Sequence, residues 1–108
     1  MKQIFICHVN LDQDVAIKIA TGFEDAGYTT WYYERDSIVA ASYIESISEA
    51  IVNCQSMMIL FSPNSVTAPE VFKEIEQAYL RRKPIIPVLL DIKHDEVHAY
   101  KSLSQMLG

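Results

Sequence analysis

Glycine is scarce in this sequence, which has three, at Gly22, Gly27 and Gly108. Dinucleotide-binding folds and P-loop proteins need a glycine-rich turn after a strand, because the backbone there must approach a phosphate closely. The first strand expected here is followed instead by the polar segment His8–Asp14. The G-x-S-x-G turn of α/β-hydrolases is missing as well. These absences exclude Rossmann-type pyrophosphate binding, a Walker A loop and a serine-nucleophile elbow.

Cysteine is nearly absent too, with Cys7 and Cys54 in or beside apolar segments. Their spacing matches neither a set of metal ligands nor the density of a secreted disulfide scaffold. We therefore expect buried free thiols, a cytoplasmic location and no bound metal. The longest apolar runs are too short to span a membrane, and the first expected strand follows Met1 too closely for a signal peptide. No membrane contact is expected.

The sequence has no surplus of positive charge, since its formal net charge is −5. Proteins that bind nucleic acid neutralise phosphates with lysine and arginine, so this acidity argues against nucleic acid as a partner. The basic cluster Arg81–Lys83 lies where a helix is expected to end, and the helix dipole favours cations there. At 108 residues the chain has room for one domain with one core.

Short apolar runs alternate with segments of helical periodicity along the chain. Apolar strands separated by helices of about 10–15 residues indicate βαβ units and a parallel sheet covered on both faces. The predicted fold is therefore a doubly wound, flavodoxin-like α/β sheet of four to five parallel strands flanked by helices. Strands are expected at Gln3–Cys7, Tyr28–Tyr33, Met57–Phe61 and Ile85–Leu90, helices at Val15–Ala26, Tyr43–Val52, Pro69–Arg82 and Asp95–Leu107, and a loop at 34–41.

In such a sheet the ligand site lies beyond the carboxyl ends of the strands. The rim predicted here consists of His8–Asp12, Glu34–Ser37, Ser62–Ser65 and Asp91. A phosphorelay receiver shares this layout but needs an acidic pair after the first strand and an aspartate that ends the third. The sequence has Cys7–His8 and Phe61–Ser62 at these places. A receiver domain is therefore excluded.

Glu74 lies at the border of a predicted buried helix face. The apolar stripe of that helix consists of Val71, Phe72, Ile75, Ala78 and Tyr79. On a helix that turns about 100° per residue, Glu74 neighbours Val71 and Ala78, about one turn from the rim. Glu70 lies one turn earlier on the same side, and like charges in this arrangement are mildly destabilising. Glu74 is thus either a half-shielded functional carboxylate or an ordinary solvated boundary residue.

Other rim and strand residues also have two interpretations. His8 is either a hydrogen-bonded strand terminus or a catalytic group. Trp31 is most simply part of the core or of a sheet face. Arg35 and Asp36 either contribute to a site or form a loop ion pair worth less than about 1 kcal/mol. Their common position on one rim favours the functional interpretation.

Four segments, in the same order along the chain, resemble the Toll/interleukin-1 receptor (TIR) domain family, bacterial members in particular. They are Phe5–His8 (FICH), Trp31–Asp36 (WYYERD), Ser62–Ser65 (SPNS) with Val71–Ala78 (VFKEIEQA), and Lys83–Val88 (KPIIPV). They are similar to the family's F-I-S-H box, to W-x-x-x-R-D before the BB loop, to S-x-N-S followed by W-V-x-x-E, and to K-P-I-I-P-V. The resemblance covers nearly the whole chain.

The resemblance implies an NAD⁺ hydrolase. Enzymatic TIR domains cleave the bond between nicotinamide and ribose, and Glu74 occupies the position of their catalytic glutamate. It also implies that His8, Tyr33, Arg35 and Asp36 border the nucleotide. Nicotinamide leaves as a neutral molecule, and a fixed carboxylate can stabilise the oxocarbenium-like ribose. NAD⁺ is then a substrate rather than a cofactor, and the product is ADP-ribose or a cyclic form of it.

The resemblance further implies activation by assembly through TIR–TIR contacts and a role as effector in bacterial antiphage defence. The alternative is a non-catalytic TIR scaffold that signals through the same contacts, with Glu74 a boundary residue. A third possibility is an unrelated flavodoxin-like domain, which would bind flavin.

The sequence departs from the family pattern at several positions. Cys7 replaces the usual serine of the first box, and Glu70 replaces a tryptophan, which places a second negative charge near the site. Residues 37–41 lack the proline and glycine that are usual in the BB loop. Family members also continue into a fifth strand and a final helix. We therefore expect residues 1–108 to be the N-terminal part of a longer protein.

Overall fold

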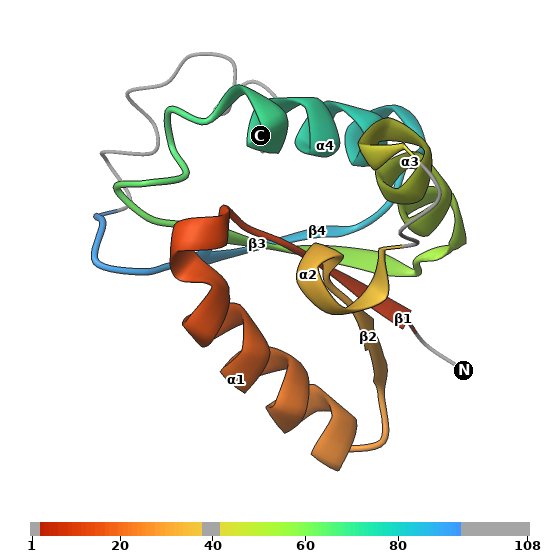
Figure 1. Ribbon diagram of the computed structural model, residues 1–108, viewed down its shortest axis with the longest axis horizontal. Helices are drawn as coiled ribbons and strands as arrows, with labels where there is room; N and C mark the ends of the chain where they lie inside the picture. The colour runs from red at the N-terminus through yellow and green to blue at the C-terminus, as the bar shows by residue number, and fades with distance from the viewer. Residues whose placement is uncertain (1–2, 38–41, 94–108) are drawn as a thin grey trace.

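The computed structural model describes residues 3–37 and 42–93 of the chain (Figure 1). One sheet contains β1 (Gln3–Cys7), β2 (Thr29–Trp31), β3 (Ser56–Phe61) and β4 (Ile85–Leu89), all paired in parallel. The order of the strands across the sheet is β2-β1-β3-β4. The expected doubly wound α/β fold is confirmed, with these four strands in the described part of the chain.

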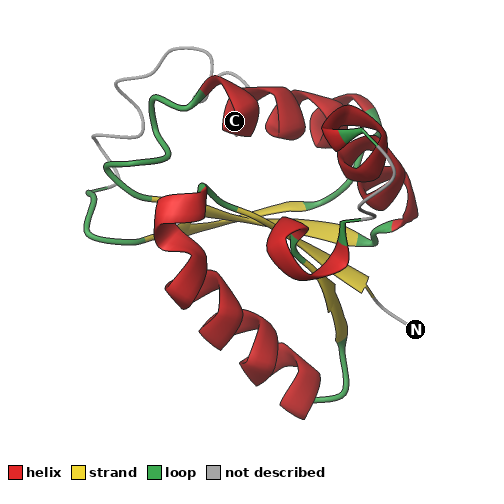
Figure 2. Cartoon of the chain, in the orientation of Figure 1, coloured by secondary structure: helices red, strands yellow, loops and turns green. Residues whose placement is uncertain are grey.

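Helices cover both faces of the sheet (Figure 2). α1 (Gln13–Asp25) lies on one face, and α3 (Tyr43–Asn53) and α4 (Pro69–Leu80) lie on the other. The strands are buried on both sides because successive side chains point in opposite directions. Phe5 and Cys7 of β1 belong to the core on the α3 and α4 side, and Ile4 and Ile6 belong to the core on the α1 side.

Local sequence signals account for the ends of these helices. Gly27, which follows α1, has a φ of +96°, a backbone conformation that side chains other than glycine's rarely allow. The Ser42 side chain accepts a hydrogen bond of 3.1 Å from the Glu45 N–H and caps α3. Pro69 occupies the first turn of α4, where its missing N–H does no harm.

The segment after β2 differs from the expected strand at Tyr28–Tyr33 and loop at 34–41. The strand is limited to Thr29–Trp31, and the next residues form the short helix α2 (Tyr33–Asp36). The Asp36 carboxylate accepts a hydrogen bond of 3.0 Å from the Tyr32 N–H, which closes this turn from within. The expected strand is therefore confirmed but shorter than predicted, and the start of the expected loop is helical, because a side-chain contact overrode the β propensity of the aromatic residues. Residues 38–41 of that loop lie outside the described residues.

One further difference concerns the start of the first helix. A 3₁₀ turn at Asn10–Asp12 leads directly into α1, so helical structure begins before the expected Val15. The expected final helix at Asp95–Leu107 lies outside the described residues.

Candidate functional site

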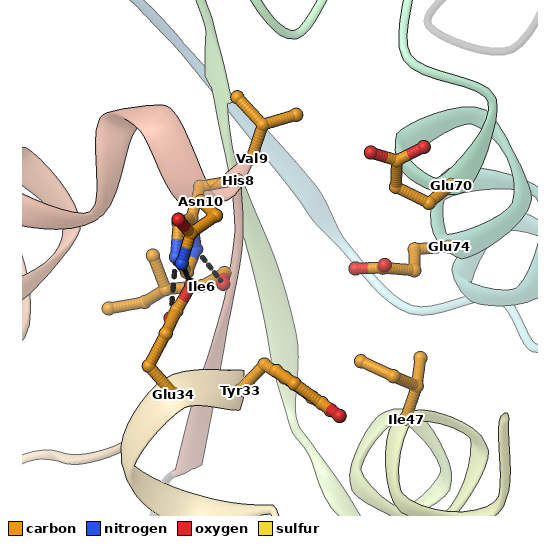
Figure 3. Close-up of a pocket in the computed structure, with 9 residues that line it drawn as sticks. All are labelled: Ile6, His8, Val9, Asn10, Tyr33, Glu34, Ile47, Glu70 and Glu74. Atoms are coloured by element: carbon orange, nitrogen blue, oxygen red, sulfur yellow. Dashed lines mark hydrogen bonds and ion pairs between the residues drawn. The ribbon is translucent and has the colours of Figure 1, made fainter. Parts of the chain in front are cut away.

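A pocket of about 360 Å³ opens at the carboxyl end of β1 (Figure 3). Small-molecule sites usually have volumes of about 300–1,000 Å³. The chain turns to one side of β1 to form β2 and to the other side to form β3, so this is the point where the strand order reverses. The residues that line the pocket are Ile6, His8, Val9, Asn10, Tyr33, Glu34, Ile47, Glu70 and Glu74.

Glu74 reaches the pocket from α4, and its carboxylate points toward the loop that follows β1 (Figure 3). The residue is 5% exposed. Its helix neighbours Val71, Ile75 and Ala78 anchor this face of α4 in the core, which fixes the direction of the glutamate side chain. An ionic group that is shielded from water in this way interacts with a nearby charge more strongly than a hydrated one.

Cys7 is fully buried at the end of β1, between the pocket-lining residues Ile6 and His8. Burial raises the pKa of its thiol well above the usual value, and the charge of Glu74 and a hydrogen bond with the Glu74 side chain raise this pKa further. The thiol therefore keeps its proton and donates a hydrogen bond to the Glu74 carboxylate. The cysteine that replaces the family's serine thus retains a donor beside Glu74.

His8 and Glu34 form an ion pair on the opposite wall of the pocket. The His8 Nε2 lies 2.8 Å from Glu34 Oε1, and Nδ1 lies 3.0 Å from the carbonyl oxygen of Ile6. Asn10 donates to the other Glu34 oxygen at 3.2 Å. Both ring nitrogens of His8 and both carboxylate oxygens of Glu34 therefore have partners within the wall.

Arg35 and Asp36 do not line this pocket, although the sequence predicted both as nucleotide contacts. The Arg35 guanidinium donates hydrogen bonds of 2.7 Å to Glu24, to Asp36 and to the carbonyl oxygen of Thr30. It also lies 4.4 Å from the centre of the Tyr32 ring, and the hydrogen bond to Asp36 raises the pKa of the guanidinium. These contacts join α2 to α1 and β2, and they hold the guanidinium outside the pocket.

The remaining rim residues form a buried hydrogen-bond network next to the pocket. Asp12, which is 7% exposed, accepts hydrogen bonds from the Ser62 hydroxyl and, at 3.2 Å, from the Asn64 amide. The backbone N–H groups of Asn64 and Ser65 donate hydrogen bonds to the hydroxyl oxygen of Ser62. The network ties the loop after β3 to the loop after β1, and so fixes the distance between the two sides of the rim.

The structure thus brings His8, Tyr33 and Glu74 together and adds residues that the predicted set lacked. Asn10 and Glu34 were within the predicted rim segments, so their position was the signal for them. Ile47 lies on α3, and only the packing of α3 against α4 places it at the pocket. A second groove of about 370 Å³ between these helices shares Ile47, Glu70 and Glu74 with the pocket and is also lined by Lys73.

Two negative findings apply to residues 3–37 and 42–93. Within them, no group of three or more histidine, cysteine, aspartate or glutamate residues is placed to hold a metal ion. No helix in these ranges is long and apolar enough to cross a membrane.

A family model for the TIR domain matches residues 4–106, which is nearly the whole chain. The chain belongs to the TIR domain family. No curated protein matches the sequence at a significant level. The bacterial character of the resemblance stays a prediction.

Solved structures share the fold of this TIR domain. The TIR domains of the activated Roq1 resistosome, which directly recognises the pathogen effector XopQ, give a TM-score of 0.81 at 12% identity over 99% of this chain and 69% of theirs. The TIR domain of the Toll-related receptor TRR-2 from Hydra magnipapillata gives 0.75 at 21% identity over 94% and 88%. The CMP N-glycosidase BcmB from Clostridium botulinum gives 0.61 at 16% identity over 91% and 81%.

Proposed function

We propose that this TIR domain hydrolyses the N-glycosidic bond between the nicotinamide and the ribose of NAD⁺, with Glu74 as the catalytic residue. The observation that carries the proposal is a buried carboxylate that points into a pocket at the topological switch point. The position of Glu74 in this chain matches that of the catalytic glutamate in enzymatic members of the family. An N-glycosidase with the same fold among the solved structures is consistent with this reaction class.

The reaction needs little proton transfer, which suits the residues present. As the bond breaks, its electron pair leaves with nicotinamide, whose ring nitrogen loses its positive charge. The ribose carbon gains that charge, and the Glu74 carboxylate stabilises it. Water then adds to this carbon and loses a proton, which yields ADP-ribose. Addition of an internal nucleophile instead of water gives a cyclic product.

The residues around Glu74 have supporting roles in this proposal. Tyr33 and Ile47 provide apolar wall for the substrate, and His8 holds Glu34 and the end of β1 in place. Arg35 and Asp36 act by fixing α2, which carries Tyr33 and Glu34, rather than by contact with the nucleotide.

The proposal extends to regulation and location. Assembly of several copies through TIR–TIR contacts would activate the enzyme, as an effector of antiphage defence in the cytoplasm. The Roq1 TIR domains were solved within an activated assembly. Cys7 and Cys54 are both free and buried, as is usual for proteins of a reducing compartment.

Chromatography of NAD⁺ incubated with the purified protein tests the proposal. We expect nicotinamide and ADP-ribose, or a cyclic form, from the wild type, and release that is at least about 100-fold slower from Glu74→Gln. Glu76→Gln is the matched control, because Glu76 is an exposed residue of the same helix and loses the same charge. Equal inertness of wild type and Glu74→Gln at high protein concentration would favour the TIR scaffold instead.

A further inference from the structure

A groove between α3 and α4 adjoins the pocket that holds Glu74. Its volume of about 370 Å³ is close to the pocket's volume of about 360 Å³. The two hollows meet at Ile47, Glu70 and Glu74, which line both of them. Glu70 and Glu74 reach this border from α4, and Ile47 reaches it from α3 (Figure 3). A ligand larger than the pocket can therefore extend past Glu74 into the groove.

The groove combines apolar surface with polar groups of both signs. The residues that line it are Ile44, Ile47, Pro69, Glu70, Lys73, Glu74 and Gln77. The polar residues of α4 recur in it at intervals of three and four, so one face of that helix forms one wall. Ile44 of α3 is 72% exposed and contributes apolar surface. Among the described lining residues of the groove, Lys73 is the one cation.

The ammonium of Lys73 is available to a ligand in the groove. It takes part in no ion pair or hydrogen bond with the part of the chain that the structure describes. The guanidinium of Arg35, in contrast, is held by Glu24 and Asp36 at 2.7 Å each. A ligand that carries negative charge beside Glu74 therefore finds its counter-charge in Lys73.

The chemical composition of NAD⁺ fits the two hollows. NAD⁺ consists of two nucleosides joined by a diphosphate, and each hollow lies at the lower end of the range of about 300–1,000 Å³ for small-molecule sites. When the ribose of the scissile bond is at Glu74, the diphosphate begins at the 5′-oxygen of that ribose, close to the border with the groove. The carboxylates of Glu70 and Glu74 repel the diphosphate there. A nearby ammonium offsets this repulsion, because charges in a partly shielded cleft attract each other more strongly than in bulk water.

We propose that Lys73 binds the diphosphate of NAD⁺ and that the groove between α3 and α4 receives the adenosine half. This inference rests on the proposed NAD⁺ hydrolase and names the residue that recognises the part of the substrate beyond the scissile bond. The diphosphate takes no part in bond cleavage, so Lys73 stabilises the bound substrate and the transition state alike. Its loss therefore raises KM and leaves kcat nearly unchanged.

Steady-state kinetics with NAD⁺ test the proposal. Lys73→Met removes the charge and keeps most of the side chain, and it should raise KM about tenfold, the equivalent of about 1.4 kcal/mol, with kcat within about twofold. Lys73→Arg keeps a cation and should return KM to within about threefold of the wild type. The matched control is Lys18→Met, which removes an exposed charge from α1 on the other face of the sheet and should change neither constant more than about twofold.

An unchanged KM in Lys73→Met, an equal rise in Lys18→Met, or a fall in kcat at constant KM would overturn the proposal. Calorimetric binding of ADP-ribose separates this result from a failure of the hydrolase, because ADP-ribose carries the diphosphate and its binding needs no catalysis. If the wild type releases no nicotinamide, the hydrolase fails, and about tenfold weaker binding of ADP-ribose by Lys73→Met than by the wild type and Lys18→Met still supports the role of Lys73. Equal binding by the three proteins, or no binding by the wild type, would overturn that role.

Discussion

A single buried side chain, Glu74, is the residue on which the account depends. Burial of an ionised carboxylate is unfavourable by several kcal/mol unless the group is hydrogen-bonded. The protonated thiol of Cys7 provides one such hydrogen bond. Cys7 lies on β1 and Glu74 on α4, and both elements are packed into the same core cluster. The pocket therefore offers a carboxylate of fixed orientation.

The thiol of Cys7 makes the free energy of unfolding depend on pH in the alkaline range. Because its pKa is raised above 9.0 in the folded state, the unfolded chain loses this proton first as the pH rises. The contribution to stability is complete below pH 9.0 and is lost as the pH rises toward the folded pKa. Urea unfolding between neutral pH and pH 10 should show a falling free energy of unfolding. Cys7→Ser should lose less over the same range, and an equal loss would contradict the assignment.

Arg35 tests whether the WYYERD segment binds substrate or stabilises α2. Its contacts with Glu24, Asp36 and the Tyr32 ring are partly exposed, so Arg35→Met should lower the free energy of unfolding by about 1 kcal/mol. Urea denaturation measures this loss. Direct contact with NAD⁺ would instead raise KM by a large factor at unchanged stability, which is the outcome the structure argues against.

At the scale of elements, the loops after β1 and β3 are held together by the Asp12 network. Asp12→Ala would leave the buried Ser62 hydroxyl and the Asn64 amide without their acceptor, so we expect a loss of about 2–3 kcal/mol in the free energy of unfolding. Asp14→Ala, at an exposed position two residues later, should lose less than about 1 kcal/mol through the helix dipole. Similar losses for the two variants would show that the network contributes little.

The strands were predictable from the sequence because their signals are local. β1 and β3 are largely continuous apolar runs, and both strands begin and end within one residue of the expected limits. α2 was not predictable, because it depends on the contact of Asp36 with Tyr32 and on Arg35 contacts with α1 and β2. Patterns of propensity do not contain such side-chain contacts.

The site was predictable in part for a similar reason. His8 and Glu74 follow from the rim rule and from the helical stripe, together with the family pattern. The role of Ile47 depends on how α3 packs against α4, and the direction of Arg35 depends on the partners it finds on α1. Both are set by tertiary packing, which one sequence does not reveal.

At the scale of the whole molecule, the order of the strands decides where chemistry can occur. β1 and β3 are central, and the segments that leave them in opposite directions create the crevice that holds the pocket. β2 and β4 are the edge strands among the described residues, and Ile86 and Leu89 on β4 are 43% and 41% exposed. The expected fifth strand and longer chain stay predictions.

Activation by assembly belongs to this scale as well. If several copies must meet before the pocket is complete, the rate of nicotinamide release per molecule should rise steeply with protein concentration. A dilution series from high to low protein concentration measures this dependence. A constant rate per molecule would show that a single TIR domain is competent by itself.

The initial rate of nicotinamide release from NAD⁺ at high protein concentration, for the wild type and for Glu74→Gln, tests the central claim most directly. Circular dichroism of both proteins establishes that they are equally folded. The account predicts release by the wild type and a rate that is at least about 100-fold lower for the variant. A loss of this size is the usual consequence of removing a group that stabilises developing charge. Equal release by the two folded proteins would contradict the assignment of Glu74 as the catalytic residue.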